Sequence, residues 1–492
     1  MTRRLFIDDG DVDRIDNLAR VLHQPAKYHG NAIVRPDRRW DNCAIQIRTT
    51  PAWDPEARRF HMIYQSAAEA LDAEPPEDGR SFACYAASED GVNWEKPDLG
   101  LFEYAGRDWA GRPLGTANNI LPTAKGMLQG PIYDGADPDP ERRFKGMRND
   151  ARSLQAAVSA DCLTWRDLEG AAVPSFDEAH LTHDAARGLF IATPKRHGPY
   201  GRSFALSTSR DFDTWTEPEL IFHADQQDQE NGFRRVRRFL DDPAYLAPVF
   251  NRPEEWRTDV YNFPLFPYEG LYLALPVMHH WIGKHPPGYE NVDSRKTVEL
   301  ASSRDLRRWD RVAGRAPFME LSPVGDGSAY DTGQLVVTNG PVRRNDELWF
   351  YYVGLRHRSL SFHDEAHRGS LDTSAVCLAR MRIDGFVGLR GGVEWGSVTS
   401  APLEVDGQAL RVNADAWRGR VQAELLDPGT GEAIEGFARQ DSRPMMADRI
   451  DEVLSWQGGS DLAALRGRTV QVRLHLWQAE IYSFWFGDLA RE

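Results

Sequence analysis

The chain has 492 residues, of which 41% are hydrophobic and 27% are charged, so it is long enough for two or more globular domains. Its formal net charge is −15 and no long run of lysine or arginine occurs, which excludes nucleic acids and anionic membrane surfaces as expected partners. No stretch approaches the ~18 apolar residues of a membrane-spanning helix, and no apolar signal segment follows the first arginines, so a cytoplasmic location is predicted.

Residues 1–40 form an irregular segment that we expect to pack on the next domain. Within it, NAIV (31–34) is a candidate strand for closing a ring of sheets. Cysteines are few and scattered, with no CxxC pair: Cys43, Cys84, Cys162 and Cys377. This pattern predicts buried thiols rather than a disulfide framework or a zinc site.

A motif of the form Ser-x-Asp-x-x-x-Trp recurs at four places along the chain. Its copies are Ser88–Trp94, Ser159–Trp165, Ser209–Trp215 and Ser303–Trp309. A fifth segment, around Asp384, keeps the turn but lacks the serine and the tryptophan. An aspartate in a turn accepts backbone N–H groups and a tryptophan packs across a hairpin, so the motif predicts a repeated β-hairpin.

A second hairpin of two apolar strands precedes each copy. In chain order the strand pairs are CAIQI with FHMIYQ, PIYDGA with FKGMR, HLTHDAARG with LFIATPKRH, YNFPLFPYEG with LYLALPVMHH, and QLVVTNG with LWFYYVG. Two hairpins make a four-stranded blade, so residues 41–390 are predicted to form a five-bladed β-propeller. From about Gly391, alternating strands and the turn DPGTG predict a C-terminal β-sandwich over residues 391–492.

Polar residues recur where the first strand of each predicted blade starts and where the second strand ends. Both positions face the same funnel of a propeller, so these side chains are expected to converge there. The strand starts supply the predicted catalytic residues Asp41, Asp177, Glu178, Asp259 and Asp331, together with Gln129. The strand ends supply Gln65, Arg148, Arg196 with His197, His279 with His280, and Arg356 with His357. Gln65, Gln129, Arg148, Arg196, His279, His280 and His357 are predicted to bind substrate, and no metal ligand is assigned.

The hairpins, the segment HQPAKYHGNAIVRPDRRWD and the sequence NNI at 118–120 together show a family resemblance. Through these features, residues 23–390 resemble the invertase, arabinanase and levansucrase superfamily, which comprises glycoside hydrolase families 32, 43 and 68. The terminal sandwich is similar to that of family 32. The resemblance implies one carboxylate from each of the first three blades: Asp41 matches the first, and Glu178 or Asp177 the third. The family-32 signatures NDPN, RDP and EC are absent. RND (148–150) does not replace RDP, because it follows the second strand of its blade instead of starting the first. The chain therefore resembles a divergent member.

The resemblance implies a glycoside hydrolase that removes a terminal, furanosidic sugar from an oligosaccharide. Asp41 would be an ionised nucleophile or base, and Glu178 the general acid, with its pKa raised by Asp259 and Asp331. Resemblance to family 43 implies a Ca²⁺ ion on the central axis, although no ligand-spaced motif requires one. The sequence specifies no oligomeric state.

Three alternatives stay open. The first is a glycoside phosphorylase similar to family 130, with Arg148, Lys195, Arg196 and histidines around phosphate. The second is a carbohydrate-binding protein without activity. The third is a sialidase, whose Asp-box has one more residue between serine and tryptophan and whose arginine triad would be Arg148, Arg196 and Arg356.

Overall fold

The computed structural model describes residues 2–68, 81–108, 110–123, 127–150, 152–284, 292–357 and 369–489. Within these ranges the chain consists of β-strands, one α-helix, α1 (Gln226–Asp241), and short 3-10 turns, namely η1 (Pro140–Arg142), η2 (Pro253–Glu255), η3 (Val312–Arg315), η6 (Arg439–Asp441) and η7 (Ala463–Leu465). The prediction of an all-β protein is therefore confirmed. None of the helical segments in the described ranges has the length and apolar character needed to span a bilayer.

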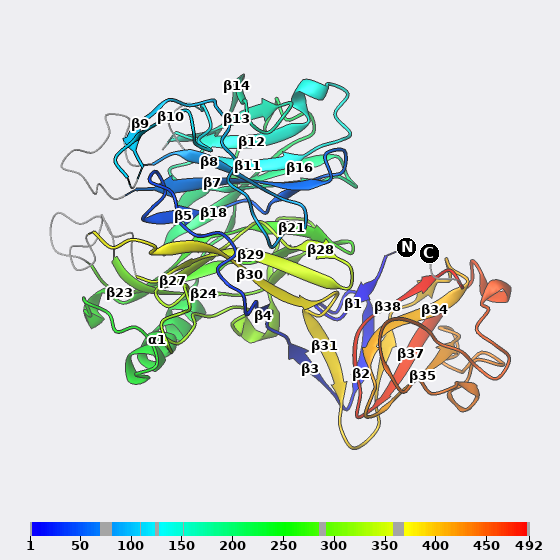
Figure 1. Ribbon diagram of the computed structural model, residues 1–492. Helices are drawn as coiled ribbons and strands as arrows, with labels where there is room; N and C mark the ends of the chain where they lie inside the picture. The colour runs from blue at the N-terminus through cyan, green and yellow to red at the C-terminus, as the bar shows by residue number, and fades with distance from the viewer. Residues whose placement is uncertain are drawn as a thin grey trace.

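One large sheet joins the beginning and the end of the predicted propeller region. It contains β27 (Gln334–Val337), β29 (Glu347–Leu355), β30 (Ser374–Arg382), β5 (Ala44–Gln46), β7 (Arg59–Ala67) and β6 (Ala52–Asp54) in that order, with β28 (Val342–Arg344) on β29, β4 (Ala26–Lys27) on β30 and β8 (Ala83–Ser88) on β7. β30 meets β5 in parallel at Ser374 and Ala44. Strands about 330 residues apart in sequence are thus held side by side (Figure 1).

Antiparallel sheets fill the region between these two ends. β11 (Met127–Tyr133), β12 (Phe144–Asn149), β13 (Ser153–Ser159) and β14 (Arg166–Pro174) form one sheet, and β15 (His180–Asp184), β16 (Leu189–Thr193), β18 (Gly201–Ser209), β17 (Lys195–Gly198) and β19 (Glu219–Phe222) form the next. They are followed by β20 (Arg257–Asn262) with β23 (Val277–Lys284) and β24 (Val292–Val298), and by β21 (Leu265–Tyr268) with β22 (Leu271–Ala274), β25 (Ala301–Ser303) and β26 (Asp310–Arg311). A small hairpin pairs β9 (Tyr104–Arg107) with β10 (Pro113–Gly115).

The predicted two-strand hairpins are confirmed by the strand pairings. β5 pairs with β7, β11 with β12, β15 with β16, β20 with β23, β21 with β22, and β27 with β29, all antiparallel. In this arrangement the start of each first strand lies beside the end of its second strand, as for Asp259 opposite His279. All four cysteines are buried free thiols, as predicted.

The four Ser-x-Asp-x-x-x-Trp turns share one hydrogen-bond network. In the first, Ser88 Oγ donates to Asp90 Oδ1 over 3.0 Å, the amides of Val92 and Asn93 donate to the same oxygen, and Trp94 Nε1 donates to the Gly91 carbonyl over 3.1 Å. The other three turns repeat these contacts. The residue after the aspartate has a positive φ in every copy, even where it is Cys162, Phe212 or Leu306. The sequence repeat is therefore a structural repeat.

The strands after residue 386 form two sheets that also take strands from the first 22 residues. One contains β3 (Leu18–Leu22), β31 (Val387–Gly391), β38 (Glu480–Gly487), β34 (Ala409–Asp415) and β36 (Asp448–Val453), with β1 (Arg4–Leu5) on β38. The other contains β2 (Val12–Asp16), β32 (Gly396–Ser400), β37 (Thr469–Trp477) and β33 (Leu403–Glu404), with β35 (Arg420–Leu426) on β37. Figure 1 shows blue β1 and β2 among the orange and red strands. Both sheets contribute side chains to one core that contains Val412, Leu474 and Trp456.

Helix α1 lies between the third and fourth predicted strand pairs, in a stretch for which the sequence analysis predicted no helix or strand. Asp225 caps it: its side chain accepts from the Asp228 amide while the Asp228 side chain accepts from the Asp225 amide. This capping box, with Pro243 just beyond the helix, is a signal that sequence inspection could have used. The domain limits at residues 40 and 390 stay a prediction.

Candidate functional site

A cluster of buried charged side chains lies where the first strands of the hairpins begin. Glu178 precedes β15, Asp259 lies in β20, and Arg48 follows β5. Lys195 opens β17 and Lys296 lies in β24. The hairpin register brings strand starts and strand ends together, as predicted, although the side chains that meet are only partly the predicted ones.

Glu178 is the buried centre of this cluster. Its Oε2 accepts from Arg48 Nε over 2.8 Å and lies 2.7 Å from Arg48 Nη2, so two guanidinium nitrogens contact the same carboxylate oxygen. The other oxygen, Oε1, lies 4.0 Å from Lys195 Nζ and has no hydrogen-bond partner. Burial acts to raise the pKa of this carboxyl, but the charges of Arg48, Lys195 and Lys296 outweigh it and lower the pKa to about 2. Glu178 is therefore an ionised carboxylate at neutral pH.

This result reverses the expected pKa shift of Glu178. The sequence analysis expected neighbouring carboxylates to raise the pKa, as a general acid requires. The groups closest to Glu178 are cations instead, because Arg48 reaches across from the segment that follows β5. An ionised Glu178 suits a nucleophile or a general base better than an acid.

Asp177 lies next to Glu178 but faces the solvent, with 47% of its side chain exposed. Lys195 Nζ donates to Asp177 Oδ2 over 2.7 Å, and the Glu178 amide donates to Asp177 Oδ1 over 2.8 Å. The Lys195 side chain is fully buried, so it links the exposed carboxylate with the buried one. Two adjacent carboxylates thus differ in exposure and share one cation.

Other cations of the cluster lie around the ring of Tyr261, which is half-buried. Lys296 Nζ lies 3.3 Å from the ring centroid, Lys195 Nζ 4.9 Å, and the Arg202 guanidinium carbon 5.9 Å. The π face of a tyrosine attracts such charges. Burial raises the pKa of Tyr261 well above its usual range, so the phenol stays protonated. The ring is a neutral surface on which the cations of the cluster converge.

Asp259 and His279 form a second buried pair beside Tyr261. Asp259 Oδ1 lies 3.0 Å from His279 Nδ1, and Arg202 donates to Asp259 Oδ2 over 3.0 Å. Burial lowers the pKa of His279 to about 4, and the pKa of Asp259 falls to about 2 because His279 and Arg202 outweigh its burial. An ionised carboxylate can only accept, so the neutral imidazole donates its Nδ1–H.

A layer of uncharged polar groups lies directly below the charged cluster. His180 Nδ1 lies 3.1 Å from the Arg48 carbonyl, and Asn262 Nδ2 lies 2.7 Å from His180 Nε2. Gln129 accepts from the Ala179 amide over 3.3 Å. Gln129 Nε2 and Asn262 Oδ1 are buried without a partner. With Glu178 Oε1 they offer hydrogen-bonding capacity that a hydroxylated ligand can satisfy.

The residues around His180 do not fit the calcium ion that the resemblance implies. Ca²⁺ takes carboxylate, carbonyl and water oxygens, whereas the charged groups that lower the pKa of His180 are Arg48 and Lys195. Both ring nitrogens of His180 already have partners. Across the described residues, no group of three or more histidine, cysteine, aspartate or glutamate side chains is arranged to hold a metal ion.

Asp41, the predicted first-blade carboxylate, lies in a separate buried cluster. Its Oδ2 accepts from Lys96 Nζ over 2.7 Å and from the Tyr64 hydroxyl over 2.9 Å, and its Oδ1 accepts the amides of Asp37 and Arg38. Burial raises its pKa, although these donors oppose the shift. Among the described residues, no contact joins Asp41 to the Glu178 cluster, because the chain reaches β5 only at Ala44.

The other predicted residues are distributed over several places. Asp331 forms an ion pair with Lys27, whose Nζ lies 2.5 Å from Asp331 Oδ2. His280 is buried against Thr258 and Thr297, on the side of α1, and burial lowers its pKa well below the usual range. Gln65 donates to Ser81 beside Gln46, and His357 follows β29.

The three predicted arginines do not meet. Arg148 is paired with Asp167, Arg196 donates to the Lys195 carbonyl over 3.3 Å, and Arg356 donates to the Gly327 carbonyl over 2.8 Å. Of the groups expected to hold phosphate, only Lys195 and His279 belong to the cluster. The structure instead adds Arg48, Arg202, Tyr261 and Lys296, which sequence analysis had not selected. The adjacent charged residues Arg295 and Lys296, which lie in β24, were the available signal.

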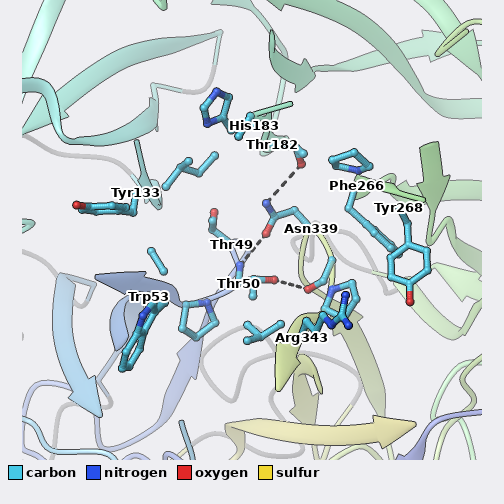
Figure 2. Close-up of a pocket in the computed structure, with 18 of the residues that line it drawn as sticks. Thr49, Thr50, Trp53, Tyr133, Thr182, His183, Phe266, Tyr268, Asn339 and Arg343 are labelled. Carbon is cyan, nitrogen blue, oxygen red and sulfur yellow. Dashed lines mark hydrogen bonds between the residues drawn. The ribbon is translucent and has the colours of Figure 1, made fainter. Parts of the chain in front are cut away.

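A pocket of about 570 Å³ lies at the opposite ends of the same first strands (Figure 2). Thr49 and Thr50 follow Arg48 there, and Asn339 follows β27. Asn339 Oδ1 accepts the Thr50 amide over 2.7 Å, and its Nδ2 donates to the Leu181 carbonyl over 2.7 Å. The rest of the lining is largely proline and aromatic, including Pro131, Trp53, Tyr133, Phe266 and Tyr268. The charged cluster is the better candidate for chemistry because it contains the buried carboxylates.

No protein-family model and no curated protein sequence matches the chain. Several solved structures are similar to it. An N-acetylgalactosamine deacetylase from F. plautii in complex with blood group B trisaccharide is 12% identical, with 76% of this chain and 96% of that chain covered and a TM-score of 0.38. A structure from the family-130 mannoside phosphorylases, which contain glycoside hydrolases that target β-1,2 mannosidic linkages in Candida mannan, is 13% identical, with coverages of 74% and 94% and a TM-score of 0.39.

A family-43 arabinoxylan arabinofuranohydrolase from Bacillus subtilis, in complex with cellotetraose, is 10% identical, with coverages of 94% and 99% and a TM-score of 0.35. Families 43 and 130 are among those to which the sequence analysis relates the chain. At these identities and TM-scores the likenesses decide nothing about the reaction, which must be inferred from the residues of the cluster.

Proposed function

We propose that the chain is a carbohydrate-active enzyme that hydrolyses a glycosidic bond, with Glu178 as nucleophile or general base and Asp177 as general acid. The observation that carries this proposal is the position of Glu178: buried, ionised, and with one oxygen free of hydrogen bonds. Hydrolysis of a glycoside needs such a carboxylate on one side of the anomeric carbon and a proton donor on the other.

Asp177 is the second carboxylate because, of the three carboxylates in the cluster, it is the one exposed to solvent. Its side chain is 47% exposed, so it can take a proton from water between turnovers. Asp259 is 1% exposed, and both of its oxygens are held by His279 and Arg202. Asp259 therefore suits electrostatic stabilisation of a positively charged transition state rather than proton transfer.

The proposed reaction removes a terminal, furanosidic sugar from an oligosaccharide. The furanosidic part is supported by the sequence resemblance alone. The proposal includes the architecture: strands β5–β8, β11–β14, β15–β19, β20–β26 and β27–β30 would be five blades of a propeller, and the two sheets that share the core around Trp456 a β-sandwich. The confirmed hairpins and that shared core support this arrangement.

The test uses the full chain with nitrophenyl glycosides, arabinofuranosides and fructo-oligosaccharides. In Glu178→Ala, turnover should fall by about 10²–10⁴ or more, and azide should restore it by forming a glycosyl azide. In Asp177→Asn, turnover of a poor leaving group should fall similarly, whereas an activated aryl leaving group should keep much of its rate because it needs no proton.

Asp41→Asn is the matched comparison, since it removes a buried carboxylate from the other cluster. Its melting temperature should fall while kcat at a permissive temperature stays near the wild-type value. Loss of turnover in Asp41→Asn together with normal turnover in Glu178→Ala would return the site to the sequence-predicted assignment. Tight sugar binding with no turnover of any glycoside would favour a binding protein instead.

A further inference from the structure

The charged cluster contains one more cation than anions. Its cations are Arg48, Lys195, Arg202 and Lys296, and its carboxylates are Asp177, Glu178 and Asp259. Arg48 pairs with Glu178, Lys195 with Asp177, and Arg202 with Asp259. The fourth cation, Lys296, donates to the neutral Gln334 Oε1 over 2.6 Å and otherwise faces the Tyr261 ring. In the described part of the chain Lys296 has no carboxylate partner.

Lys296 differs in this respect from the other buried lysines of the protein. Lys145 lies 2.8 Å from both Asp134 and Asp137, Lys195 lies 2.7 Å from Asp177, and Lys96 lies 2.7 Å from Asp41. Lys296 is just as buried, at 1% exposure. Burying an ammonium without a counter-charge is costly. Burial, and next the charge of Arg48, lower the pKa of Lys296 well below its usual range, so a bound anion, by supplying the missing counter-charge, would favour the ammonium form of Lys296.

The surplus charge is local, since the whole chain carries a formal net charge of −15. Lys195, Lys296 and Arg202 all lie within 6 Å of the Tyr261 ring centroid. The same tyrosine lies beside His279, whose Nδ1–H is already donated to Asp259. Cations that converge on one neutral ring, next to a carboxylate with a free oxygen, form a complementary surface for a negatively charged group.

We propose that the cluster binds an oxyanion beside Glu178, with Lys296 as its unshared counter-charge and with Lys195 and Arg202 as further donors. The proposal rests on the proposed function only in placing the anion next to the reacting carboxylate. The oxyanion has two chemical sources: the carboxylate of a uronic acid unit in the substrate, or free inorganic phosphate.

The two sources lead to different reactions. With a uronic acid, water forms the new bond to the anomeric carbon as the bond to the leaving oxygen breaks. Glu178 takes the proton that the water loses, and the leaving oxygen takes the proton of Asp177. With phosphate, a phosphate oxygen forms the new bond to the anomeric carbon as the bond to the leaving oxygen breaks. That oxygen again takes a proton from Asp177, and a sugar 1-phosphate is released in place of the free sugar.

Binding is measured first, without turnover. The ligands for calorimetry and thermal shift are inorganic phosphate, methyl glucuronide and methyl galacturonide, with methyl glucoside and methyl galactoside as neutral controls. At least one of the anionic ligands should bind and raise the melting temperature of the wild type, more strongly at low salt, and the neutral glycosides should bind more weakly. Lys296→Met should reduce the affinity for that anion at least tenfold, while Lys284→Met, an exposed change at the end of β23, should not.

The melting temperature of ligand-free Lys296→Met separates a binding lysine from a structural one. Because methionine removes an unpaired buried charge, this variant should melt higher than the wild type; a structural lysine would give a lower value. The proposal is overturned if phosphate and both uronides leave the wild type unchanged, or if Lys296→Met binds them normally. Anion binding without any turnover would overturn the proposed function alone, and turnover of neutral glycosides without anion dependence would overturn this proposal alone.

Discussion

The first strands of the hairpins have buried charged side chains at one end and mainly uncharged side chains at the other. At the strand starts, Glu178, Asp259 and their cations are buried against one another. At the strand ends, the pocket of Figure 2 is lined mainly by threonine, proline and aromatic side chains, with Asn339 as the central hydrogen-bonding group. The distance between these ends is one short strand, as from Glu178 to His183.

This difference shows that the hydrogen-bonded strands position both ends, whereas the side chains determine which end can carry out chemistry. At the pocket end, the Thr50 amide donates to Asn339 and the Thr50 hydroxyl donates to the Gly340 carbonyl, so these polar groups join neighbouring strands. At the cluster end, Glu178, Gln129 and Asn262 keep polar atoms without partners. Unsatisfied polar groups cost stability, and at the cluster end they lie beside an ionised carboxylate, where a ligand could satisfy them.

The largest expected difference between the two ends is in the response to losing an arginine. Arg48→Met leaves the buried Glu178 carboxylate without its guanidinium partner, so we expect a loss of about 3–5 kcal/mol in the free energy of unfolding. Arg343→Met, at an exposed arginine of the pocket, should stay within about 0.5 kcal/mol of the wild type. Urea denaturation of the two variants measures both values, and equal losses would refute the distinction between the ends.

A second difference is in the response to acid. The pKa of Glu178 in the folded protein, about 2, lies below the ordinary value of 4.5, so its ionisation stabilises the fold above about pH 4.5. That contribution, about 3 kcal/mol, is lost as the pH falls from about 4.5 to about 2. The difference in unfolding free energy between wild type and Glu178→Gln should therefore be largest near neutral pH and shrink toward pH 2. A difference that does not change with pH would contradict the ionised state.

A smaller effect is expected from Asn339→Ala at the pocket end. The change removes the acceptor for the Thr50 amide and the donor to the Leu181 carbonyl, and should cost about 1–3 kcal/mol. Since this residue lies at the far end from Glu178, kcat should not change at temperatures where the variant is folded. A parallel loss of kcat would show that the pocket end takes part in the reaction.

The smallest effect, and of opposite sign, is expected from Thr49→Val. The Thr49 hydroxyl is buried and has no hydrogen-bond partner, whereas valine has nearly the same shape. The variant should be unchanged or more stable by up to about 1 kcal/mol, as shown by its melting temperature. A clear loss of stability would mean that the hydroxyl has a polar partner in solution.

Local patterns predicted the parts of the fold that depend on local contacts. The four Ser-x-Asp-x-x-x-Trp turns are closed by hydrogen bonds within seven residues, so their sequence repeat is enough to identify them. Glu178, Asp259, His279 and Gln129 were found in the same way, because alternation along a strand shows where the strand starts.

Contacts between segments far apart in sequence were not accessible to such patterns. Arg48 stands 130 positions before Glu178, and nothing near either residue indicates the pair. Lys296 lies in β24, outside the strand pairs that the sequence analysis identified, so its position relative to Glu178 could not be predicted. Asp41 contacts Lys96 and Tyr64, and these contacts depend on tertiary packing rather than on the strand pattern.

The pairing of β1, β2 and β3 with β38, β32 and β31 has a consequence for how the protein is made. A ribosome releases residues 4–22 first, but Leu5 pairs with Ser483, Val12 with Ser400 and Leu18 with Gly391. These early strands must wait, with open hydrogen-bonding edges, until their partner strands between residues 387 and 487 have been translated. Closing loops of this length is slow, so the last step of folding in the cell should be the annealing of the first strands onto the newest ones.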